Sequence, residues 1–276
     1  MDKITSIAQL QELILYVRNL RQGFVTNFYL DEDKHGAWIQ TGKFLYDKYE
    51  DTILLLFDHE APDSEDYFTN LFYISTSIAS VKDHLKQYPK KYIYDLYVLD
   101  IVGRDAMCAP TVEALKAIGA KERASLVRMN RVGNPEPTMM QQDERVVYAN
   151  ADDLKQIGSL LHTYFDEKIE QIPLSSEIAR MIADKRVLKC IVNGNIAGIL
   201  LFEQNASTLY LRYWLTIPEY RDQGIGGALL KRFFYAGKET KRQILWVLQD
   251  NENAIKRYEH YGFKQEHMYD YILTYC

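Results

Sequence analysis

The sequence predicts an α+β protein (α/β mixed) in which mixed central sheets are flanked by helices and the chain forms two domains. Its 276 residues are long for one small domain and suit two domains of ordinary size. Helical and strand-like patterns alternate along both halves. Residues 130–144 interrupt them with two prolines and a glycine in a polar run, which is typical of a linker. We therefore expect domains at residues 1–135 and 136–276.

The first half opens with an amphipathic helix, because Leu10, Leu13, Ile14, Val17 and Leu20 recur at helical spacing. Strand-like and helical runs follow it. The expected strands are 52–57, 70–76, 92–99 and 124–129, and the expected helices lie near 81–87 and 110–118.

The second half has a more regular order, β-α-α-β-β-β-α-β-α-β. Asn193 and Gly194 predict a tight hairpin turn, since both residues tolerate positive φ. The expected strands are 146–149, 187–192, 197–204, 209–215, 244–248 and 264–274, and the expected helices are 151–164, 175–184, 226–237 and 253–261.

Residues 218–230 read Pro-Glu-Tyr-Arg-Asp-Gln-Gly-Ile-Gly-Gly-Ala-Leu-Leu, between an expected strand and an expected helix. Unpaired backbone N–H groups and the helix dipole at such a place form an anion cradle. Gly224 and Gly226 lack a Cβ, which would let a diphosphate approach the main chain. A dinucleotide-binding Gly-x-Gly-x-x-Gly would need glycine where Leu229 stands, and a Walker loop would need Gly-Lys-Ser/Thr. Taken alone, the glycines fit a turn that binds nothing equally well.

Residues 250–263 read Asp-Asn-Glu-Asn-Ala-Ile-Lys-Arg-Tyr-Glu-His-Tyr-Gly-Phe. Ala254 and Tyr258 are four residues apart, so they share one helical face. Gly262 suits a helix C-cap before the last strand. The simpler explanation of Asn251 is a helix N-cap, and that of Tyr258 is a packed core tyrosine.

Both segments resemble motifs of the GNAT family of acyl-CoA-dependent N-acetyltransferases. Arg221-Asp222-Gln223-Gly224-Ile225-Gly226 resembles its pyrophosphate loop, and Asn251, Ala254, Tyr258, Gly262 and Phe263 match its second motif. The resemblance implies a GNAT fold for residues 136–276 with acetyl-CoA as co-substrate. It implies that the strand end pairs with pantetheine and that the amides of residues 222–227 hold the pyrophosphate. The implied cofactor-binding residues are Trp214, Leu215, Thr216, Arg221, Asp222, Gln223, Gly224, Ile225, Gly226, Gly227, Asn251 and Tyr258.

The resemblance also implies direct attack of an amine on the thioester within a ternary complex. Tyr258 is then the expected catalytic acid for the departing thiolate, and the main-chain N–H near Leu215 the expected oxyanion donor. Many members of the family place a glutamate on the central strands. Here neither strand carries a carboxylate, and Glu203 on a neighbouring strand is as well explained by a surface position. The base is therefore left unassigned.

A segment of the first half has weak sequence similarity to a segment of the second. Residues 110–121 resemble 253–264, with Gly119 at the place of Gly262, which suggests a tandem of two GNAT-like domains. The same offset places Leu115 at Tyr258, and Val81 and Asp83 at the loop glycines. These substitutions predict a first domain without catalysis. An unrelated α/β domain with a chance match is the alternative.

Composition restricts the classes of ligand and partner that the chain is expected to bind. A net charge of −5 argues against a broad surface for nucleic acid or anionic membrane. The six histidines show no metal-ligand spacing, so we expect no metal. Three cysteines without a C-x-x-C pair, no signal-like start and no long apolar run indicate a cytoplasmic protein. The acidic stretch 166–170 would suit a cationic amine, although a solvated helix end explains it more simply.

The sequence thus predicts an N-acetyltransferase acting on an amine of a small molecule or peptide, with no nucleic acid or membrane partner. Two alternatives stay open: a non-catalytic acyl-CoA-binding or regulatory module, and an acyltransferase with a longer acyl donor. The acceptor is not specified by the sequence, and monomer and homodimer are both left open.

Overall fold

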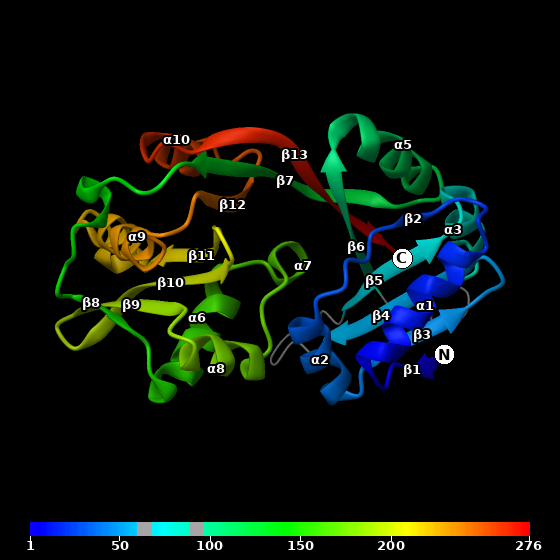
Figure 1. Ribbon diagram of the computed structural model, residues 1–276, viewed down its shortest axis with the longest axis horizontal. Helices are drawn as coiled ribbons and strands as arrows, with labels where there is room; N and C mark the ends of the chain where they lie inside the picture. The colour runs from blue at the N-terminus through cyan, green and yellow to red at the C-terminus, as the bar shows by residue number, and fades with distance from the viewer. Residues whose placement is uncertain (60–67, 89–95) are drawn as a thin grey trace. The chain divides into compact units, whose positions relative to one another are not determined.

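The computed structural model describes residues 1–59, 68–88 and 96–276, which form two compact units (Figure 1). The first unit comprises Met1–Ser125 together with Met268–Cys276. The second comprises Leu126–His267. The last nine residues of the chain therefore belong to the first unit.

The first unit has a mixed sheet in the order β1-β3-β4-β5-β6-β13, with the short β2 paired to β5. Its neighbours are antiparallel except for β5 and β6, which are parallel. In chain order its elements are β1 (Asp2–Lys3), α1 (Ile7–Asn19), β2 (Val25–Thr26), α2 (Glu32–Thr41), β3 (Phe44–Lys48), β4 (Thr52–His59), β5 (Phe68–Ser75), α3 (Ile78–Leu85), β6 (Leu96–Arg104), α5 (Asp105–Lys116), the start of β7 (Lys121–Val132) and the end of β13 (Lys264–Tyr275).

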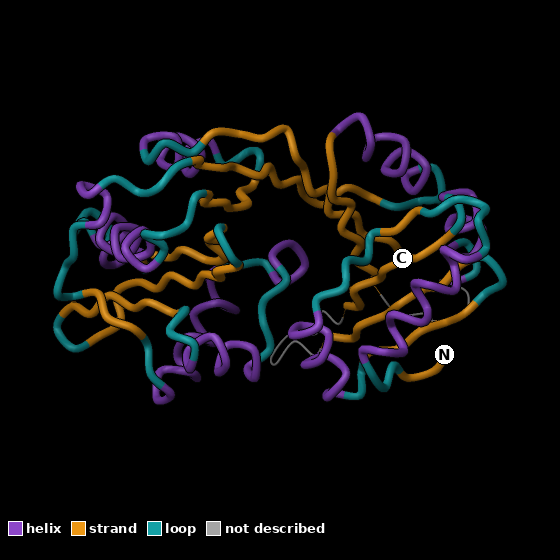
Figure 2. Tube along the Cα trace, viewed as in Figure 1, coloured by secondary structure: helices purple, strands orange, loops and turns teal. Residues whose placement is uncertain are grey.

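Helices cover both faces of this sheet (Figure 2). One face packs against α3 and α5 through a core that includes Leu71 and Tyr73 of β5 and Leu115 of α5. The other face packs against α1 and α2, where Trp38 stacks on Phe57 with ring centroids 4.0 Å apart. Burial of apolar surface on both faces is what holds the three layers together.

The second unit repeats this plan with the sheet order β8-β9-β10-β11-β12-β7. Only β11 and β12 are parallel neighbours. Its further elements are β8 (Val146–Tyr148), α6 (Leu154–Tyr164), α7 (Glu167–Glu170), α8 (Ser175–Ala183), β9 (Val187–Val192), β10 (Asn195–Asn205), β11 (Thr208–Thr216), α9 (Ile225–Ala236), β12 (Arg242–Leu248) and α10 (Glu252–His260), with the short 3-10 turns η1 (Pro137–Met140), η2 (Ala151–Asp153) and η3 (Pro218–Tyr220).

The two faces of the second sheet are covered by different helices. Ile199 and Tyr213 share a core with Ile157 of α6 and Ile182 of α8. Phe202, on the other face of β10, meets Phe233 of α9 edge to face with centroids 5.7 Å apart. The order of elements and the placement of helices match those of the first unit, so the predicted repeat is present in the fold.

Each sheet is completed by the last strand of the other repeat. β7 follows α5 in the sequence, yet its residues 126–132 pair with β12 in the second unit. β13 follows α10, yet its residues 268–275 pair with β6 in the first. The division therefore falls inside β7 rather than at the linker expected at 135/136. Local composition marks the Pro-rich run, but long-range strand pairing decides which unit a strand joins.

Most expected elements are found within a few residues of their predicted bounds. The hairpin turn is confirmed, since Asn193 and Gly194 have φ of 51° and 80°. The elements β1, β2, α2, β3 and α7 were not expected from the sequence. Capping signals for α2 were present, because Asp31 caps its first turn and Gly42 ends it in the left-handed conformation. Residues 92–95 of one expected strand lie outside the described residues. Within the described chain, no helix is long and apolar enough to cross a membrane.

Candidate functional site

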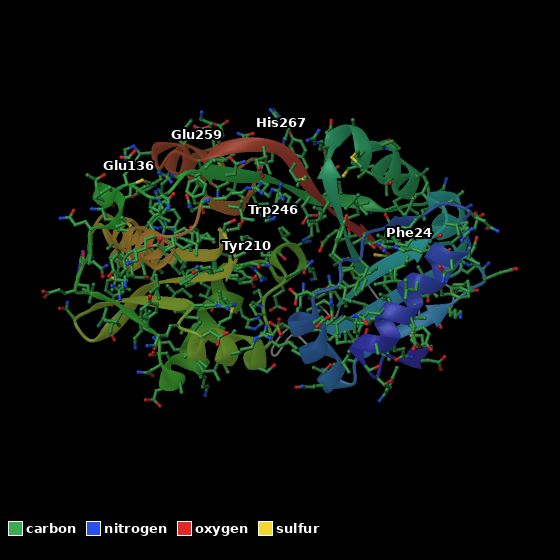
Figure 3. The ribbon with its side chains drawn as sticks, viewed as in Figure 1. Phe24, Glu136, Tyr210, Trp246, Glu259 and His267 are labelled. Atoms are coloured by element: carbon green, nitrogen blue, oxygen red, sulfur yellow. The ribbon has the colours of Figure 1, made fainter. Side chains whose placement is uncertain are left out.

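The parallel strands β11 and β12 are joined at only one end. Thr208–Leu211 pairs with Arg242–Leu245, although β11 runs on to Thr216 and β12 to Leu248. Figure 3 labels Tyr210 in the paired part of β11 and Trp246 in the part of β12 beyond it. No described strand pairs with this edge of β11 past Leu211. The strands therefore separate in the second unit and leave an open backbone edge.

A β-bulge explains where the separation starts. On β10, Leu201 pairs with Tyr213 and the next residue, Phe202, pairs with Leu211. Arg212 is therefore the extra residue on β11. A bulge bends its strand and increases the local twist, so β11 turns away from β12 immediately after Leu211.

The backbone groups on the open edge can be assigned from the alternation of an antiparallel ladder. The Ile217 N–H donates to Ala197 O on β10 at 3.0 Å. A Cβ on Gly198 would lie 2.7 Å from Leu215 O, so the Leu215 carbonyl also faces β10. Residues between them face the opposite way. The open edge thus presents Trp214 and Thr216, and the oxyanion donor expected near Leu215 shifts to these adjacent amides.

The loop after β11 carries a row of free amides. η3 leads into Asp222 with φ 62° and Gly224 with φ 73°, and α9 begins at Ile225. Among the described residues, no acceptor is found for the backbone N–H groups of residues 222–227. Arg221, Asp222, Gln223 and Gly224 are exposed, whereas Ile225 is buried in the core. Free N–H groups at a helix start, open to solvent, are what the anion cradle requires.

The two loop glycines have different reasons to be glycine. At Gly224 φ is positive and a Cβ would meet nothing within 4 Å, so the backbone conformation is the constraint. At Gly226 a Cβ would lie 3.1 Å from the Trp214 ring and 3.2 Å from Thr216 Oγ1. The expectation that Gly226 lets a diphosphate approach the main chain stays a prediction, and packing gives a second reason for glycine here. Its missing Cβ lets the start of α9 pack against the end of β11.

Trp214 joins the separate parts of the predicted site. Its ring contacts the start of α9 at Gly226 and lies 5.5 Å from the Tyr258 ring of α10, centroid to centroid. Arg257 lies over the same indole at 5.9 Å. The Trp214 Nε1–H is buried without a partner among the described residues. A buried donor without an acceptor is costly, so this N–H marks a place where a ligand acceptor would be stabilising.

Tyr258 is enclosed but its hydroxyl is not engaged. The side chain is 8% exposed, and its hydroxyl makes no hydrogen bond to any described residue. Burial raises the pKa of Tyr258 above its usual value, and the nearby Arg257 cation partly offsets this. The phenol is therefore protonated throughout the neutral pH range and can donate a hydrogen bond or a proton.

The second motif otherwise has structural roles. Asn251 Oδ1 accepts from the Ala254 N–H at 3.1 Å, which is a helix N-cap. Gly262 has φ 84° and ends α10. Cofactor binding by Asn251 stays a prediction. Within β11 and β12 no carboxylate is present, and Glu203 is bound by Arg212 Nη1 at 2.5 Å. Glu203 is thus an ion-pair partner rather than a free base.

The first unit has the same separation of strands but fills it. Among the described residues β5 pairs with β6 over Phe68–Asn70, and β2 then pairs with the end of β5. Asn27 follows β2, and its side chain donates to Leu71 O at 3.2 Å and accepts from the Tyr73 N–H at 2.7 Å. The backbone edge that is open in the second unit is therefore saturated here by the chain itself.

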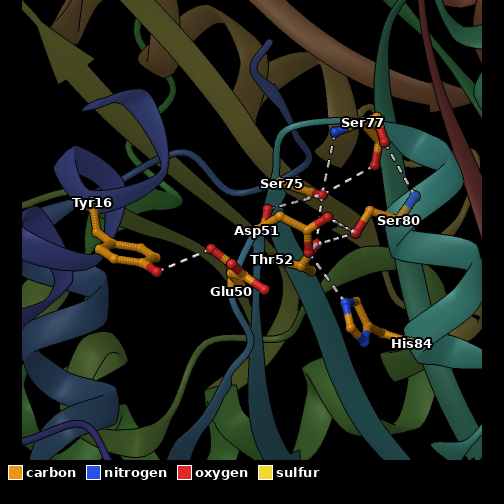
Figure 4. A network of polar contacts seen from close by, with 8 residues as sticks. All are labelled: Tyr16, Glu50, Asp51, Thr52, Ser75, Ser77, Ser80 and His84. Carbon is orange, nitrogen blue, oxygen red and sulfur yellow. Dashed lines mark hydrogen bonds and ion pairs between the residues drawn. The ribbon is translucent and has the colours of Figure 1, made fainter. Parts of the chain in front are cut away.

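The helix start in the first unit is also closed. Only Thr76 and Ser77 lie between β5 and α3, whereas residues 217–224 lie between β11 and α9. Ser77 Oγ accepts from the Ser80 N–H, and Ser80 Oγ donates to Asp51 Oδ2 at 2.6 Å (Figure 4). The Ser80 hydrogen bond holds the pKa of Asp51 below its usual value, which keeps a carboxylate at this position.

The predicted correspondence of Val81 and Asp83 with the loop glycines is corrected, since Val81 is a core residue inside α3. The shorter loop changes the offset between the repeats, so Ser77 takes the place of Gly224. An adjoining pocket of about 650 Å³ has Glu50, Asp51 and Asp83 among its lining residues. Carboxylates repel a phosphate, so the first unit lacks an anion site here for a chemical reason as well as a geometric one.

Among the described residues, no cluster of three or more His, Cys, Asp or Glu could hold a metal ion. The free cysteines are Cys108 and Cys190, which are buried, and Cys276, which is exposed.

The predicted site residues divide into two groups. The structure brings together the end of β11, the loop to α9, and Tyr258. It gives Asn251 a cap and leaves the base to be found elsewhere.

Comparison with known proteins agrees with this description. The family model described as the Acetyltransferase (GNAT) family matches residues 154–263. None of the curated proteins compared with the chain matches it.

Three solved structures are similar over most of the chain. An acetyltransferase from the GNAT family of Colwellia psychrerythraea has 12% identity and a TM-score of 0.57, covering 99% of this chain and 98% of that chain. A GCN5-related N-acetyltransferase from Sphaerobacter thermophilus has 14% identity and a TM-score of 0.58, covering 81% and 76%. A tandem GNAT protein from the clavulanic acid biosynthesis pathway has 11% identity and a TM-score of 0.55, covering 82% and 78%. At these identities the likeness shows the fold, and it agrees with two GNAT-like halves.

Proposed function

Since residues 154–263 form a GNAT acetyltransferase domain, we propose that the chain transfers an acetyl group from acetyl-CoA directly to an amine in a ternary complex. The observation that supports this most is the combination of six free amides at residues 222–227 with the open edge of β11. Backbone groups left unpaired in this way need an acceptor and a strand partner. Acetyl-CoA offers both, because its pyrophosphate is an anion and its pantetheine arm carries amides.

The loop amides would hold the pyrophosphate, helped by the positive end of the α9 dipole. The edge at Trp214 and Thr216 would pair with the pantetheine amides as an added strand does. The Trp214 indole N–H offers a further donor close to Tyr258. In the first unit β2 and Asn27 already occupy the equivalent edge. We therefore assign one donor site to each chain.

The chemistry follows from these positions. The amine nitrogen attacks the thioester carbon, its lone pair forms the N–C bond, and the C–S bond breaks. One of the open-edge amides, at Trp214 or Thr216, would stabilise the oxyanion. Tyr258 then gives a proton to the departing thiolate, a role worth about 10²–10⁴ in rate for a general acid. Holding both reactants together contributes further, because it removes the entropy cost of their encounter.

The alternative is a module that binds acyl-CoA without transferring it. The absence of a carboxylate from β11 and β12, both fully described, favours this alternative. Thiol release with amines, polyamines, aminoglycosides and peptide N-termini distinguishes the two, and a series of longer acyl donors tests chain length. Binding of acetyl-CoA without release of thiol from any acceptor would favour the module.

Donor binding is tested first by calorimetry with acetyl-CoA. Gln223→Glu adds one negative charge to the exposed loop without changing side-chain length. At about 6 Å and an effective dielectric constant of about 40, one added charge costs about 1.4 kcal/mol, or about tenfold in Kd. Gln204→Glu is the matched control. Gln204 is exposed on β10 and pairs with Leu209, near the end of β11 that is remote from the loop. Equal affinities for both variants and the native chain would place the donor elsewhere.

A further inference from the structure

The transfer needs a group to take the proton from the amine, and β11 and β12, whose residues are all described, carry no carboxylate for it. The described carboxylates near β11 are mostly engaged. Glu203 binds Arg212, Glu167 binds His162 at 2.6 Å, and Glu177 accepts from the Leu174 N–H at 2.9 Å. Glu170, the last residue of the single-turn helix α7, differs from Glu203 and Glu167. Among the described residues no lysine, arginine or histidine forms an ion pair with it.

Tyr213 fixes α7 to the separated part of β11. The Tyr213 hydroxyl donates to Glu170 O at 2.7 Å and to Gln171 O at 2.9 Å. Phe165, which precedes α7, meets the Tyr213 ring edge to face at 5.2 Å. Tyr213 comes directly before Trp214, whose indole contacts Tyr258. The end of α7 is therefore hydrogen-bonded to the residue of β11 that precedes Trp214.

The Glu170 charge also acts on the phenols of Tyr258 and Tyr213. The Glu170 side chain is half-buried, and so are the other residues of the acidic stretch, which is therefore not the solvated helix end that the sequence suggested. Burial raises the pKa of Tyr258, and the Glu170 charge raises it further. The Glu170 charge also contributes to the raised pKa of Tyr213, for which burial is the main cause. The Glu170 carboxylate therefore interacts electrostatically with both tyrosines.

We propose that Glu170 is the general base, and that its carboxylate accepts the proton from the attacking amine. This assignment rests on the proposed acetyl transfer. The nitrogen forms its bond to the acyl carbon and loses one proton to Glu170, while Tyr258 gives one proton to the thiolate. The two protons balance, and both groups exchange with water before the next cycle. The negative charge at Glu170 also attracts a cationic amine, which releases one further proton to water before its nitrogen can attack.

The environment of Glu170 suits this role. Burial raises its pKa to about 7, so near neutral pH a large fraction is ionised and can accept a proton. The Asp166 backbone N–H favours the ionised form, while the Asp166 carboxylate opposes it. The charged or titratable groups around it include Asp166, which caps α7, and Glu167 and Lys168 within α7. The adjacent elements add, among others, His162 on α6, Arg212 and Tyr213 on β11, and Arg257 and Tyr258 on α10.

The test compares the native chain with Glu170→Gln over pH 5.5 to 9.5, with kcat/KM for thiol release as the readout. The ionisation of the amine is common to both proteins, so the ratio of their kcat/KM values isolates Glu170. We expect the ratio to rise as pH passes through about 7 and to level off at about 10² or more. Glu170→Asp should retain the pH dependence at a lower rate.

Glu167→Gln is the matched control, because it removes a carboxylate from the same helix and should leave the ratio near one at every pH. A ratio near one throughout between the native chain and Glu170→Gln would overturn the assignment. So would a large ratio that does not change with pH, since it indicates a structural role only. If the native chain binds acetyl-CoA but releases no thiol with any acceptor, the proposed transfer fails, and the base fails with it.

Discussion

Replacing Tyr258 by phenylalanine separates acid catalysis from binding and folding. The ring contacts would be kept, because Trp214 and Phe263 pack against the aromatic ring at 5.5 and 6.0 Å. The hydroxyl makes no hydrogen bond to a described residue, so its loss should change the free energy of unfolding by less than about 1 kcal/mol. Acetyl-CoA affinity should change by no more than about threefold. Turnover should fall about 10²-fold, which corresponds to about 2.7 kcal/mol of transition-state stabilisation.

The assay measures thiol release at saturating acceptor and the Kd for acetyl-CoA on the same preparations. Because burial raises the pKa of Tyr258, the native chain should show no loss of rate from phenol ionisation below about pH 10. Tyr235→Phe, an exposed tyrosine on α9, is the control for removing a hydroxyl. Unchanged turnover in Tyr258→Phe would refute the acid role. A loss of affinity as large as the loss of turnover would make Tyr258 a binding residue.

Two further predictions concern the filled edge in the first unit. Calorimetry should give one acetyl-CoA per chain, because β2 and Asn27 occupy the edge of β5, and a stoichiometry of two would contradict this. Asn27→Ala should lower the free energy of unfolding by about 2–4 kcal/mol in urea titrations, because it leaves Leu71 O and the Tyr73 N–H unpaired in a buried position. Stability unchanged within error would show that water replaces the Asn27 amide.

The parts of the predicted site that a single sequence reveals are those where the backbone conformation is fixed locally. Gly224 must be glycine because its φ is positive, and Gly262 because it ends α10 in the left-handed conformation. These constraints act over a few residues, so a single sequence reveals them. At Gly226 the close contact with Trp214, which only packing creates, adds a reason for glycine that the sequence does not reveal.

The base could not be predicted because nothing near Glu170 in the sequence distinguishes it from its neighbours. Glu167 and Glu170 belong to the same short acidic run, and either could have been a solvated helix end. Tyr213 lies 43 residues after Glu170 in the sequence, and its hydrogen bonds fix the end of α7 beside β11. A bond between residues so far apart leaves no periodic signal.

By itself, the sequence determined the order of helices and strands in the second half apart from the single-turn α7, the glycine-containing loop between β11 and α9, and the similarity between the two halves. Periodicity, turn chemistry and capping carry this information, because each arises within one or two turns of chain. Tertiary structure alone decided that β7 and β13 complete the sheets of the opposite repeats, and that β2 fills the edge left open in the second unit. Strand pairing joins backbone groups of any sequence at any separation, so its partners are settled only when the whole chain has folded.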